Sequence, residues 1–128
     1  MTQPKVVALG GGHGLAATLR SLRKLTTDLT AIVTVADNGG SSGRLREEFH
    51  SLPPGDLRMA LAALCSDDQW GRSWADVMQY RFTSDGPLNG HAVGNLLLAA
   101  LWDRDSDIIA SLDQVAALLK VEGRVLPM

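Results

Sequence analysis

The chain has 128 residues, with 12 Lys and Arg against 14 Asp and Glu, a formal net charge of -2 and a pI near 5.8. Its 45% hydrophobic content is enough for one domain with a buried core, and its acidic balance argues against a general nucleic-acid or membrane-surface binder. The one cysteine, Cys65, excludes an internal disulfide and fits a reducing compartment. No apolar run has the length of a membrane span and no signal-peptide pattern is present, so we expect a cytoplasmic protein without membrane insertion.

The chain opens with a short apolar strand followed by a glycine-rich turn. Residues 5–9 show no alternation of apolar and polar side chains, which predicts a strand covered on both faces. The turn consists of Gly10, Gly11, Gly12, His13 and Gly14. Leucines then recur at helical spacing from Leu15 to Leu25. A strand, a turn and an amphipathic helix in this order predict the start of a parallel α/β sheet.

Two interpretations of this turn stay open. Gly12 to Ala17 fits the G-x-G-x-x-A dinucleotide fingerprint, and Asp37 follows at the distance of a ribose-binding carboxylate, which is typical of an NAD site. Many glycine-rich first turns produce this match, and no Lys-Ser or Lys-Thr pair completes a P-loop. The more general interpretation is that backbone amides at a helix N-terminus face a ligand at the carboxyl end of the sheet, with His13 beside it.

The second predicted strand, residues 29–35, leads into the most informative stretch of the sequence. This stretch contains Asp37, Asn38, Gly39, Gly40, Ser41, Ser42, Gly43 and Arg44. Exposed backbone amides, hydroxyls and guanidinium groups are suited to an anionic, phosphorylated ligand. We therefore expect an anion-binding loop at residues 39–43, followed by a short helical turn at 45–49; a plain Gly/Ser surface loop is the alternative.

A Pro-Pro-Gly connector precedes the next predicted helix, residues 57–64, for which Asp56 is a plausible N-cap. Arg58 falls in the first turn, where a cation is unfavourable to the helix dipole. Arg58 therefore indicates either an anionic partner or a solvated side chain. We expect a further helix over residues 74–82, and the pattern does not assign Trp70.

The segment from Asn89 to Asn95 precedes an apolar run, residues 96–101, which predicts a buried helix. Asn89 and His91 are expected near the start of this helix, with Gly94 and Asn95 about one turn inside. Because glycine costs about 1 kcal/mol relative to alanine inside a helix, Gly94 indicates close approach by a neighbouring backbone or a ligand. For His91, a ligand contact and a structural hydrogen bond stay equally open, and Asn95 one turn later on the same face favours the ligand.

The last predicted helix covers residues 106–120 and is followed by a strand after Gly123. Asp103, Asp105 and Asp107 lie before or within its first turn. Capping and the helix dipole explain these carboxylates better than a metal site does.

Four segments resemble one protein family in content and order. They are Gly10–Leu15, Ala31–Arg46, Pro53–Arg58 and Leu88–Leu96, and they are spread over residues 10–96, most of the chain. They resemble the family of the gluconeogenesis factor YvcK and 2-phospho-L-lactate transferase (CofD). The second segment is more similar to the YvcK branch.

The resemblance implies a Rossmann-like three-layer α/β fold with a mainly parallel sheet, in which residues 1–128 form the N-terminal part of a single larger domain. For the YvcK branch it implies a regulator of cell-wall and central carbon metabolism and of cell shape that binds UDP-N-acetylglucosamine. For the transferase branch it implies transfer of phospholactate from a nucleotide diphosphate donor to a deazaflavin alcohol, with Mg²⁺. His13 and Asn38 depart from the threonine and second aspartate of many relatives, and the loss of that carboxylate weakens the case for transfer.

The first hypothesis is a nucleotide-sugar-binding regulator without catalytic residues. The glycine turn and residues 39–43 would hold the nucleotide and diphosphate with Arg44, while Asp37 accepts a hydrogen bond from a hydroxyl group. The candidate ligand-binding residues are Gly10, Gly11, Gly12, His13, Gly14, Asp37, Asn38, Gly39, Gly40, Ser41, Ser42, Gly43, Arg44, Asp56, Arg58, Asn89, His91, Gly94 and Asn95. Asn89, His91 and Asn95 would line the far side.

The second hypothesis is a transferase of the phospholactate transferase type, in which Asp37, with or without Asp56, positions Mg²⁺ beside a diphosphate. The third, an NAD-dependent oxidoreductase, depends on the glycine fingerprint alone and lacks a clear acid–base pair. We expect a nucleotide sugar as the partner, no nucleic acid, and no required cofactor outside the transferase hypothesis. The oligomeric state, a homo-oligomer included, stays open.

Overall fold

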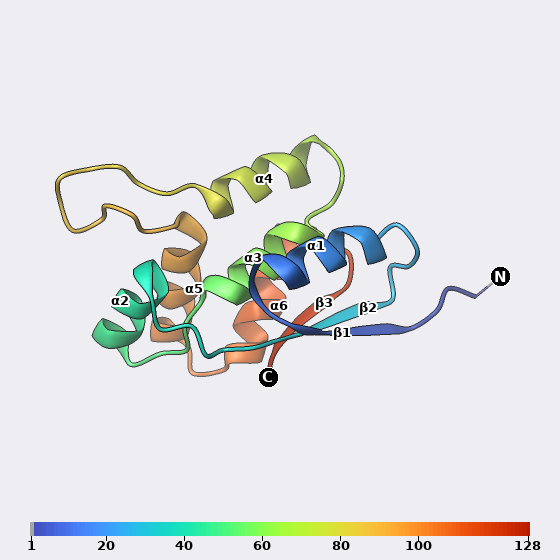
Figure 1. Ribbon diagram of the computed structural model, residues 1–128, viewed down its shortest axis with the longest axis horizontal. Helices are drawn as coiled ribbons and strands as arrows, with labels where there is room; N and C mark the ends of the chain where they lie inside the picture. Colours follow the sequence, from blue (N-terminus) through green and yellow to red (C-terminus); the bar gives the residue numbers. More distant parts are fainter. Residues whose placement is uncertain (1) are drawn as a thin grey trace.

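A computed structural model of the chain describes residues 2–128 (Figure 1). The elements are β1 (Val6–Gly10), α1 (Gly12–Leu22), β2 (Leu29–Val33), α2 (Gly40–Phe49), α3 (Gly55–Leu64), α4 (Gln69–Gln79), α5 (Val93–Arg104), α6 (Ile108–Leu118) and β3 (Arg124–Pro127). This is an α/β fold, which confirms the predicted class.

The three strands form one parallel sheet in the order β1-β2-β3. Ala8 pairs with Ala31, and Ala31 pairs with Val125, so these three small or branched side chains share one face. Helix α1 connects β1 to β2, and the other helices lie in the longer connection from β2 to β3. Because the strands are parallel, the segments leaving β1 and β2 begin at the same edge of the sheet.

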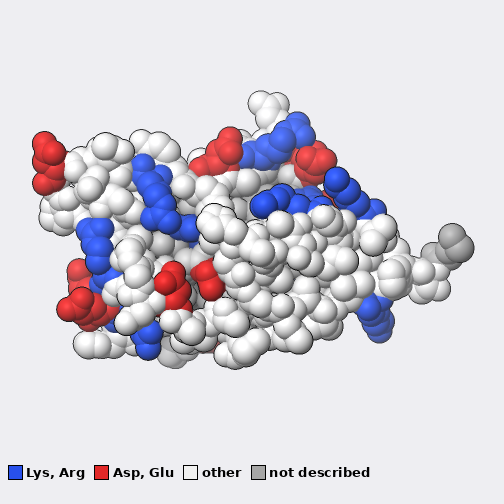
Figure 2. All heavy atoms as spheres, in the orientation of Figure 1, with Lys and Arg blue, Asp and Glu red and all other residues white. Residues whose placement is uncertain are grey.

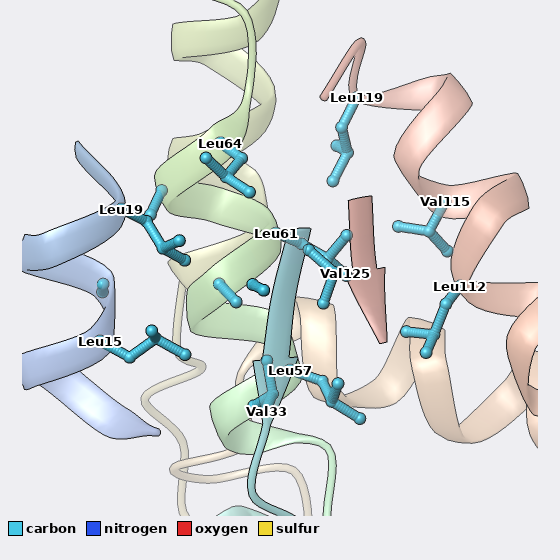
Figure 3. Packing of buried hydrophobic residues seen from close by; sticks show 14 of the residues in the cluster. Leu15, Leu19, Val33, Leu57, Leu61, Leu64, Leu112, Val115, Leu119 and Val125 are labelled. Carbon is cyan, nitrogen blue, oxygen red and sulfur yellow. The ribbon is translucent and has the colours of Figure 1, made fainter. Parts of the chain in front are cut away.

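Helix α3 lies at the centre of the hydrophobic core. Its residues Leu57, Leu61 and Leu64 are fully buried, and their spacing places them on one face of the helix. Figure 3 shows them between Leu15 and Leu19 of α1 on one side and the buried residues of α6 on the other. Each such leucine contributes about 1.5–3 kcal/mol through burial, so α3 is the element that the surrounding helices and the sheet depend on.

The opposite face of the sheet is open. Val7 is 62% exposed and Leu9 is 68% exposed, whereas Ala8 between them is buried. The expectation that both faces of the first strand are covered is therefore wrong for the described residues, because α1 and α3 cover one face only. The residues of β1 are apolar, as predicted, but more exposed and less exposed residues alternate along the strand.

Several element boundaries differ from the predictions. Helix α1 ends at Leu22, so Leu25 lies beyond it and is exposed. Helix α4 ends at Gln79, and Phe82 lies in an extended segment, because the neighbouring Arg81 forms an antiparallel bridge with Ala92. The predicted strand after Gly123 is confirmed as β3.

The last helix covers Ile108–Leu118 and is shorter at both ends than predicted. It is capped by Asp107, whose carboxylate accepts from the Ala110 backbone N–H at 3.0 Å, which confirms the predicted capping role. Cys65 is buried in the hydrophobic core. Trp70, which the sequence did not assign, donates its indole N–H to the Leu118 carbonyl. Within residues 2–128, no helix is long and apolar enough to cross a membrane, and no cluster of three or more acidic, His or Cys side chains is arranged for a metal ion.

Candidate functional site

The N-termini of α1, α2, α3 and α5 meet around one cavity of about 590 Å³. It is lined by Gly12, His13, Asp37, Gly39, Gly40, Ser41, Ser42, Gly55, Asp56, Arg58, Met59, Gln79, Arg81 and Asn95. The first backbone N–H groups of a helix have no partner inside the helix, and they carry partial positive charge. Four such ends lie around the same space, although the first N–H of α5, that of Val93, already donates to the Tyr80 carbonyl at 2.8 Å. Figure 2 shows acidic and basic groups close together over the region between the starts of α1 and α2.

These four helices differ from the other two in how their N-termini are capped. None of α1, α2, α3 and α5 has a side-chain hydrogen bond from its N-cap residue. The two remaining helices both have an aspartate cap, Asp68 on α4 and Asp107 on α6. The helices that face the cavity thus leave their N-terminal donors free of a cap side chain.

Residues 40–43 form the first turn of α2, which corrects the prediction of a loop over residues 39–43. Gly40 has a φ of 53°, a value that favours glycine, and it starts the helix. A Cβ on Gly43 would lie 2.3 Å from the Asn38 carbonyl oxygen, so only glycine fits there. Asp37 accepts from the Gly39 N–H at 3.0 Å, which holds its carboxylate beside the helix start.

Arg58 is buried at the cavity, with 5% of its surface exposed, and its Nε and Nη1 atoms have no hydrogen-bond acceptor. The alternative of a solvated arginine is therefore wrong. Burial, the largest effect, and Arg81 lower the pKa of Arg58, Asp56 and Asp37 raise it, and together they bring it to about 10. A buried cation without partners is costly, and an anion in the cavity would offset that cost.

Two carboxylates flank the same cavity. Asp56 accepts a hydrogen bond from the Thr34 hydroxyl at 3.3 Å. It lies in the first turn of α3, where Pro54 is the N-cap residue, so the prediction that Asp56 caps the helix is wrong. A Cβ on Gly55 would lie 3.5 Å from Asp37 Oδ2, and one on Gly11 would lie 2.7 Å from Asp56 Oδ2. Gly11 thus leaves space for the Asp56 carboxylate, whereas the distance at Gly55 is that of an ordinary contact.

A buried hydrogen-bond cluster joins α2 to α5. Ser41 Oγ lies 2.7 Å from His91 Nδ1 and accepts from Asn95 Nδ2 at 3.1 Å. Burial, the largest effect, and Arg44 and Arg81 lower the pKa of His91, while Glu48 opposes them. His91 thus has a hydrogen-bond partner within the protein. Asn95 Oδ1 is buried without a partner and Asn95 lines the cavity, so it has an acceptor left for a ligand.

Helix α5 begins at Val93, so Gly94 and Asn95 lie in its first turn and not one turn inside. A Cβ on Gly94 would lie 2.7 Å from Arg58 Cγ and 2.8 Å from the Met78 carbonyl oxygen. The predicted close approach of a neighbouring backbone at Gly94 is confirmed. It brings α5 against the side chain of Arg58.

The other predicted residues do not line this cavity. Gly10, Gly11 and Gly14 form or follow the first turn, and Asn38, Gly43 and Arg44 line a separate hollow of about 560 Å³ on α2. Arg44 Nη1 donates to the Asn89 carbonyl at 2.7 Å and Nη2 donates to the Pro87 carbonyl, so Arg44 holds the loop before α5. The Asn89 side chain accepts from the Ser84 N–H at 3.0 Å.

Four lining residues were missed by the sequence reasoning: Gly55, Met59, Gln79 and Arg81. Gly55 and Met59 flank Arg58 on α3 and follow from its position. Gln79 and Arg81 come from the end of α4, which reaches the cavity through the Arg81–Ala92 bridge. No local pattern signals that long-range pairing.

Comparison with known proteins places the chain among a set of bacterial relatives. Residues 6–128 match the family model described as 2-phospho-L-lactate transferase CofD. A putative gluconeogenesis factor of Mycobacterium leprae is 61% identical over 98% of this chain, which covers 35% of that relative. The gluconeogenesis factor of Bacillus subtilis is 46% identical over 98% of this chain and 38% of its own length. The chain thus spans little more than a third of the length of these curated relatives.

A solved structure gives the same fold. A crystal structure of a Bacillus halodurans protein, described as a member of the UPF0052 family, superposes with a TM-score of 0.85 at 42% identity. The match covers 97% of this chain and 39% of that one. The arrangement of strands and helices described above is therefore shared with a protein more than twice as long.

Proposed function

The chain belongs to the CofD family, and from that membership we propose that it is a cytoplasmic regulatory protein that binds a nucleotide sugar through the diphosphate group. It is a homologue of bacterial gluconeogenesis factors. The resemblance to the YvcK branch makes UDP-N-acetylglucosamine the expected ligand, with a role in cell-wall and central carbon metabolism and in cell shape.

The observation that carries the proposal is the buried, unpartnered guanidinium of Arg58 beside four helix N-termini without cap side chains. A diphosphate presents several anionic oxygens within a short distance. Backbone N–H groups at helix N-termini and an arginine fork are suited to such oxygens. A ligand of this kind would supply the acceptors that Arg58 lacks.

The carboxylates give the cavity a second chemical character. Asp37 and Asp56 cannot donate hydrogen bonds when ionised, so they suit the hydroxyl groups of a ribose or a sugar. Asn95 Oδ1, which has no partner, offers one more acceptor. Donors for phosphate and acceptors for hydroxyls in one cavity favour a sugar nucleotide over inorganic phosphate.

The same carboxylates support a second candidate, a transferase that uses Mg²⁺. Mg²⁺ is held by one or two carboxylates together with substrate phosphates, and Asp37 and Asp56 fit that donor set. When bound, the ion would neutralise charge on the diphosphate. Asp37 and Asp56 would hold the ion, and Arg58 would orient the phosphate. The regulator stays the preferred proposal because Asn38 stands where many relatives have a second aspartate.

Calorimetric titration with UDP-N-acetylglucosamine, with and without Mg²⁺, tests the proposal. Arg58→Met should weaken binding about 10- to 100-fold, the loss of roughly 1.5–3 kcal/mol expected for a hydrogen bond to a charged group. Arg72→Met is the matched control, because Arg72 lies on the surface of α4 in an exposed ion pair with Asp67. Binding that needs Mg²⁺ would favour the transferase. Equal affinity in a folded Arg58→Met variant, or no binding by the wild-type chain, would contradict the proposal.

A further inference from the structure

The N-terminus of α2 carries a hydroxyl group hydrogen-bonded to a histidine from another part of the chain. Ser41 Oγ lies 2.7 Å from His91 Nδ1, and Asn95 Nδ2 donates to the same oxygen at 3.1 Å. Because Asn95 donates, the hydroxyl proton of Ser41 is free to point at His91 Nδ1. We propose that Ser41 is a nucleophile with His91 as its general base, and that the cavity cleaves carboxylic esters that carry an anionic group.

The local sequence is of the kind that presents a reactive serine. Gly39, Gly40, Ser41, Ser42 and Gly43 fit the pattern G-x-S-x-G, and they form the N-cap and first turn of α2, the helix that follows β2. In the nucleophile elbow of hydrolases, this pattern places the serine at a sharp strand-to-helix turn. Here Gly40 takes the positive φ of the turn, and Gly43 allows the close approach of the Asn38 backbone. Because β2 already ends at Val33 and the positive φ belongs to Gly40 and not to Ser41, the match to the elbow is one of sequence, and the structure adds the histidine partner.

The charge that develops during ester cleavage has donors nearby. The N–H groups of Ser41 and Ser42 lie in the first turn of α2, where no cap side chain accepts from them. Donors of this kind stabilise the oxyanion that forms when a serine attacks a carbonyl. The guanidinium of Arg58 lines the same cavity without a partner and can hold an anionic substituent of the substrate.

The reaction balances with these groups and water. Ser41 Oγ forms a bond to the carbonyl carbon as its proton passes to His91 Nδ1. The tetrahedral intermediate collapses, the ester C–O bond breaks, and the leaving alkoxide takes the proton from His91. Water then attacks the acyl-serine, giving a proton to His91, and the breakdown of the second intermediate returns that proton to Ser41 and releases the carboxylic acid.

The state of His91 suits a base. Burial lowers its pKa, and Arg44 on α2 and Arg81 before α5 act in the same direction, while Glu48 on α2 opposes them. The imidazole is therefore neutral at pH 7 and can accept a proton. Within residues 2–128, no carboxylate is hydrogen-bonded to His91, so the pair is a dyad and should be slower than a full triad.

The full chain is tested with two chromogenic esters and one covalent probe. Hydrolysis of p-nitrophenyl acetate is compared with that of mono-p-nitrophenyl succinate, and a fluorophosphonate is used to label the reactive serine for peptide mass spectrometry. We expect the label on Ser41 and faster cleavage of the anionic succinate ester. Ser41→Ala should abolish labelling and turnover, while Ser73→Ala, an exposed serine on α4, should change neither.

His91→Asn separates a base from a structural tie, because asparagine can still hydrogen-bond Ser41 but cannot take a proton at neutral pH. It should lower turnover by about 10²-fold, as expected for loss of a general base. The wild-type rate should rise with pH and level off above a pKa below 6.5. Absence of label on Ser41 in the folded wild-type protein, unchanged turnover in Ser41→Ala, or a wild-type rate and pH profile in His91→Asn would each overturn the proposal. Nucleotide-sugar binding is measured separately by calorimetry, so either proposal can fail alone.

Discussion

Gly94 is the residue on which the position of Arg58 depends. The side-chain stem of Arg58 passes over Gly94, and the Met78 backbone approaches the same Cα. A larger residue would push the arginine away from the cavity or move α4. Because Gly94 has no side chain, α3, α4 and α5 can pack closely together beside the site.

Gly94→Ala should destabilise the protein by about 1–3 kcal/mol, the usual cost of forcing a methyl group into a packed interior. The reason is that the Met78 carbonyl oxygen, at 2.8 Å from the new Cβ, is backbone and cannot rotate away. Urea unfolding followed by circular dichroism measures the change.

Gly14→Ala is the matched control. Gly14 lies in α1, and a Cβ there would meet no atom within 4 Å. Alanine should stabilise the helix by up to about 1 kcal/mol, because glycine is the weaker helix former. Equal effects of the two substitutions would contradict the role given to Gly94.

Residue-level prediction succeeded where the chemistry of one position was decisive. Gly94 in a helical pattern predicted close approach, and the structure confirms it. The burial of Arg58 could not be predicted, because it is caused by α5 and the end of α4, which come later in the chain. The position of Arg58 in the first turn of a predicted helix was consistent both with an anion-binding side chain and with a solvated one.

At the level of elements, two substitutions at helix N-caps should affect stability and ligand binding differently. Asp107→Ala removes the cap of α6 and should cost about 1 kcal/mol in the free energy of unfolding, with no effect on ligand affinity. Gly39→Ser adds a cap to α2, and should leave stability equal or raise it by a few tenths of a kcal/mol, about what a serine cap gains over glycine. Its hydroxyl would compete with the diphosphate for the N–H groups of α2.

Thermal unfolding and calorimetric titration of both variants check this prediction. Gly39→Ser should bind the nucleotide sugar more weakly than the wild type, and Asp107→Ala should bind it equally well. A Gly39→Ser variant with full affinity would show that the α2 N-terminus does not contact the diphosphate.

The contact between α2 and α5 should make stability depend on pH. The pKa of His91 is lowered in the folded protein, so below pH 6.5 the unfolded chain binds more protons than the folded one. Stability should therefore fall as the pH drops below 6.5 and recover above it. Urea unfolding of the wild type and of His91→Asn between pH 5 and 7 isolates this contribution, and a slope that persists unchanged in the variant would assign it to other groups.

The start of α2 shows why an element was misread. Glycine and serine are weak helix formers, so residues 40–43 indicated a loop. The structure nevertheless begins a helix there, because Gly40 takes a positive φ and residues 45–49 continue the turn. The prediction that these residues bind an anion does not depend on this difference, because free N–H groups at the start of a helix can bind an anion as well as those of a loop can.

For the molecule as a whole, the predicted order of strands and helices was enough to predict where most of the site lies. Parallel strands send their following segments to one edge, so the first glycine turn and the segment around Asp37 were expected to meet there, and both line the cavity. The wall formed by Gln79 and Arg81 was not foreseen. It depends on the Arg81–Ala92 bridge, a pairing between residues whose sequence carries no strand pattern.

The open face of the sheet leads to a prediction about association. Val7 and Leu9 are exposed on β1, which is also an edge strand of the sheet. Apolar side chains beside unpaired strand N–H and C=O groups favour pairing with another copy. We therefore expect the chain to self-associate as its concentration rises. Val7→Thr with Leu9→Thr should shift sedimentation towards the monomer and leave the melting temperature nearly unchanged, because both side chains already face solvent. If the double variant sediments like the wild type, the contact between copies lies elsewhere.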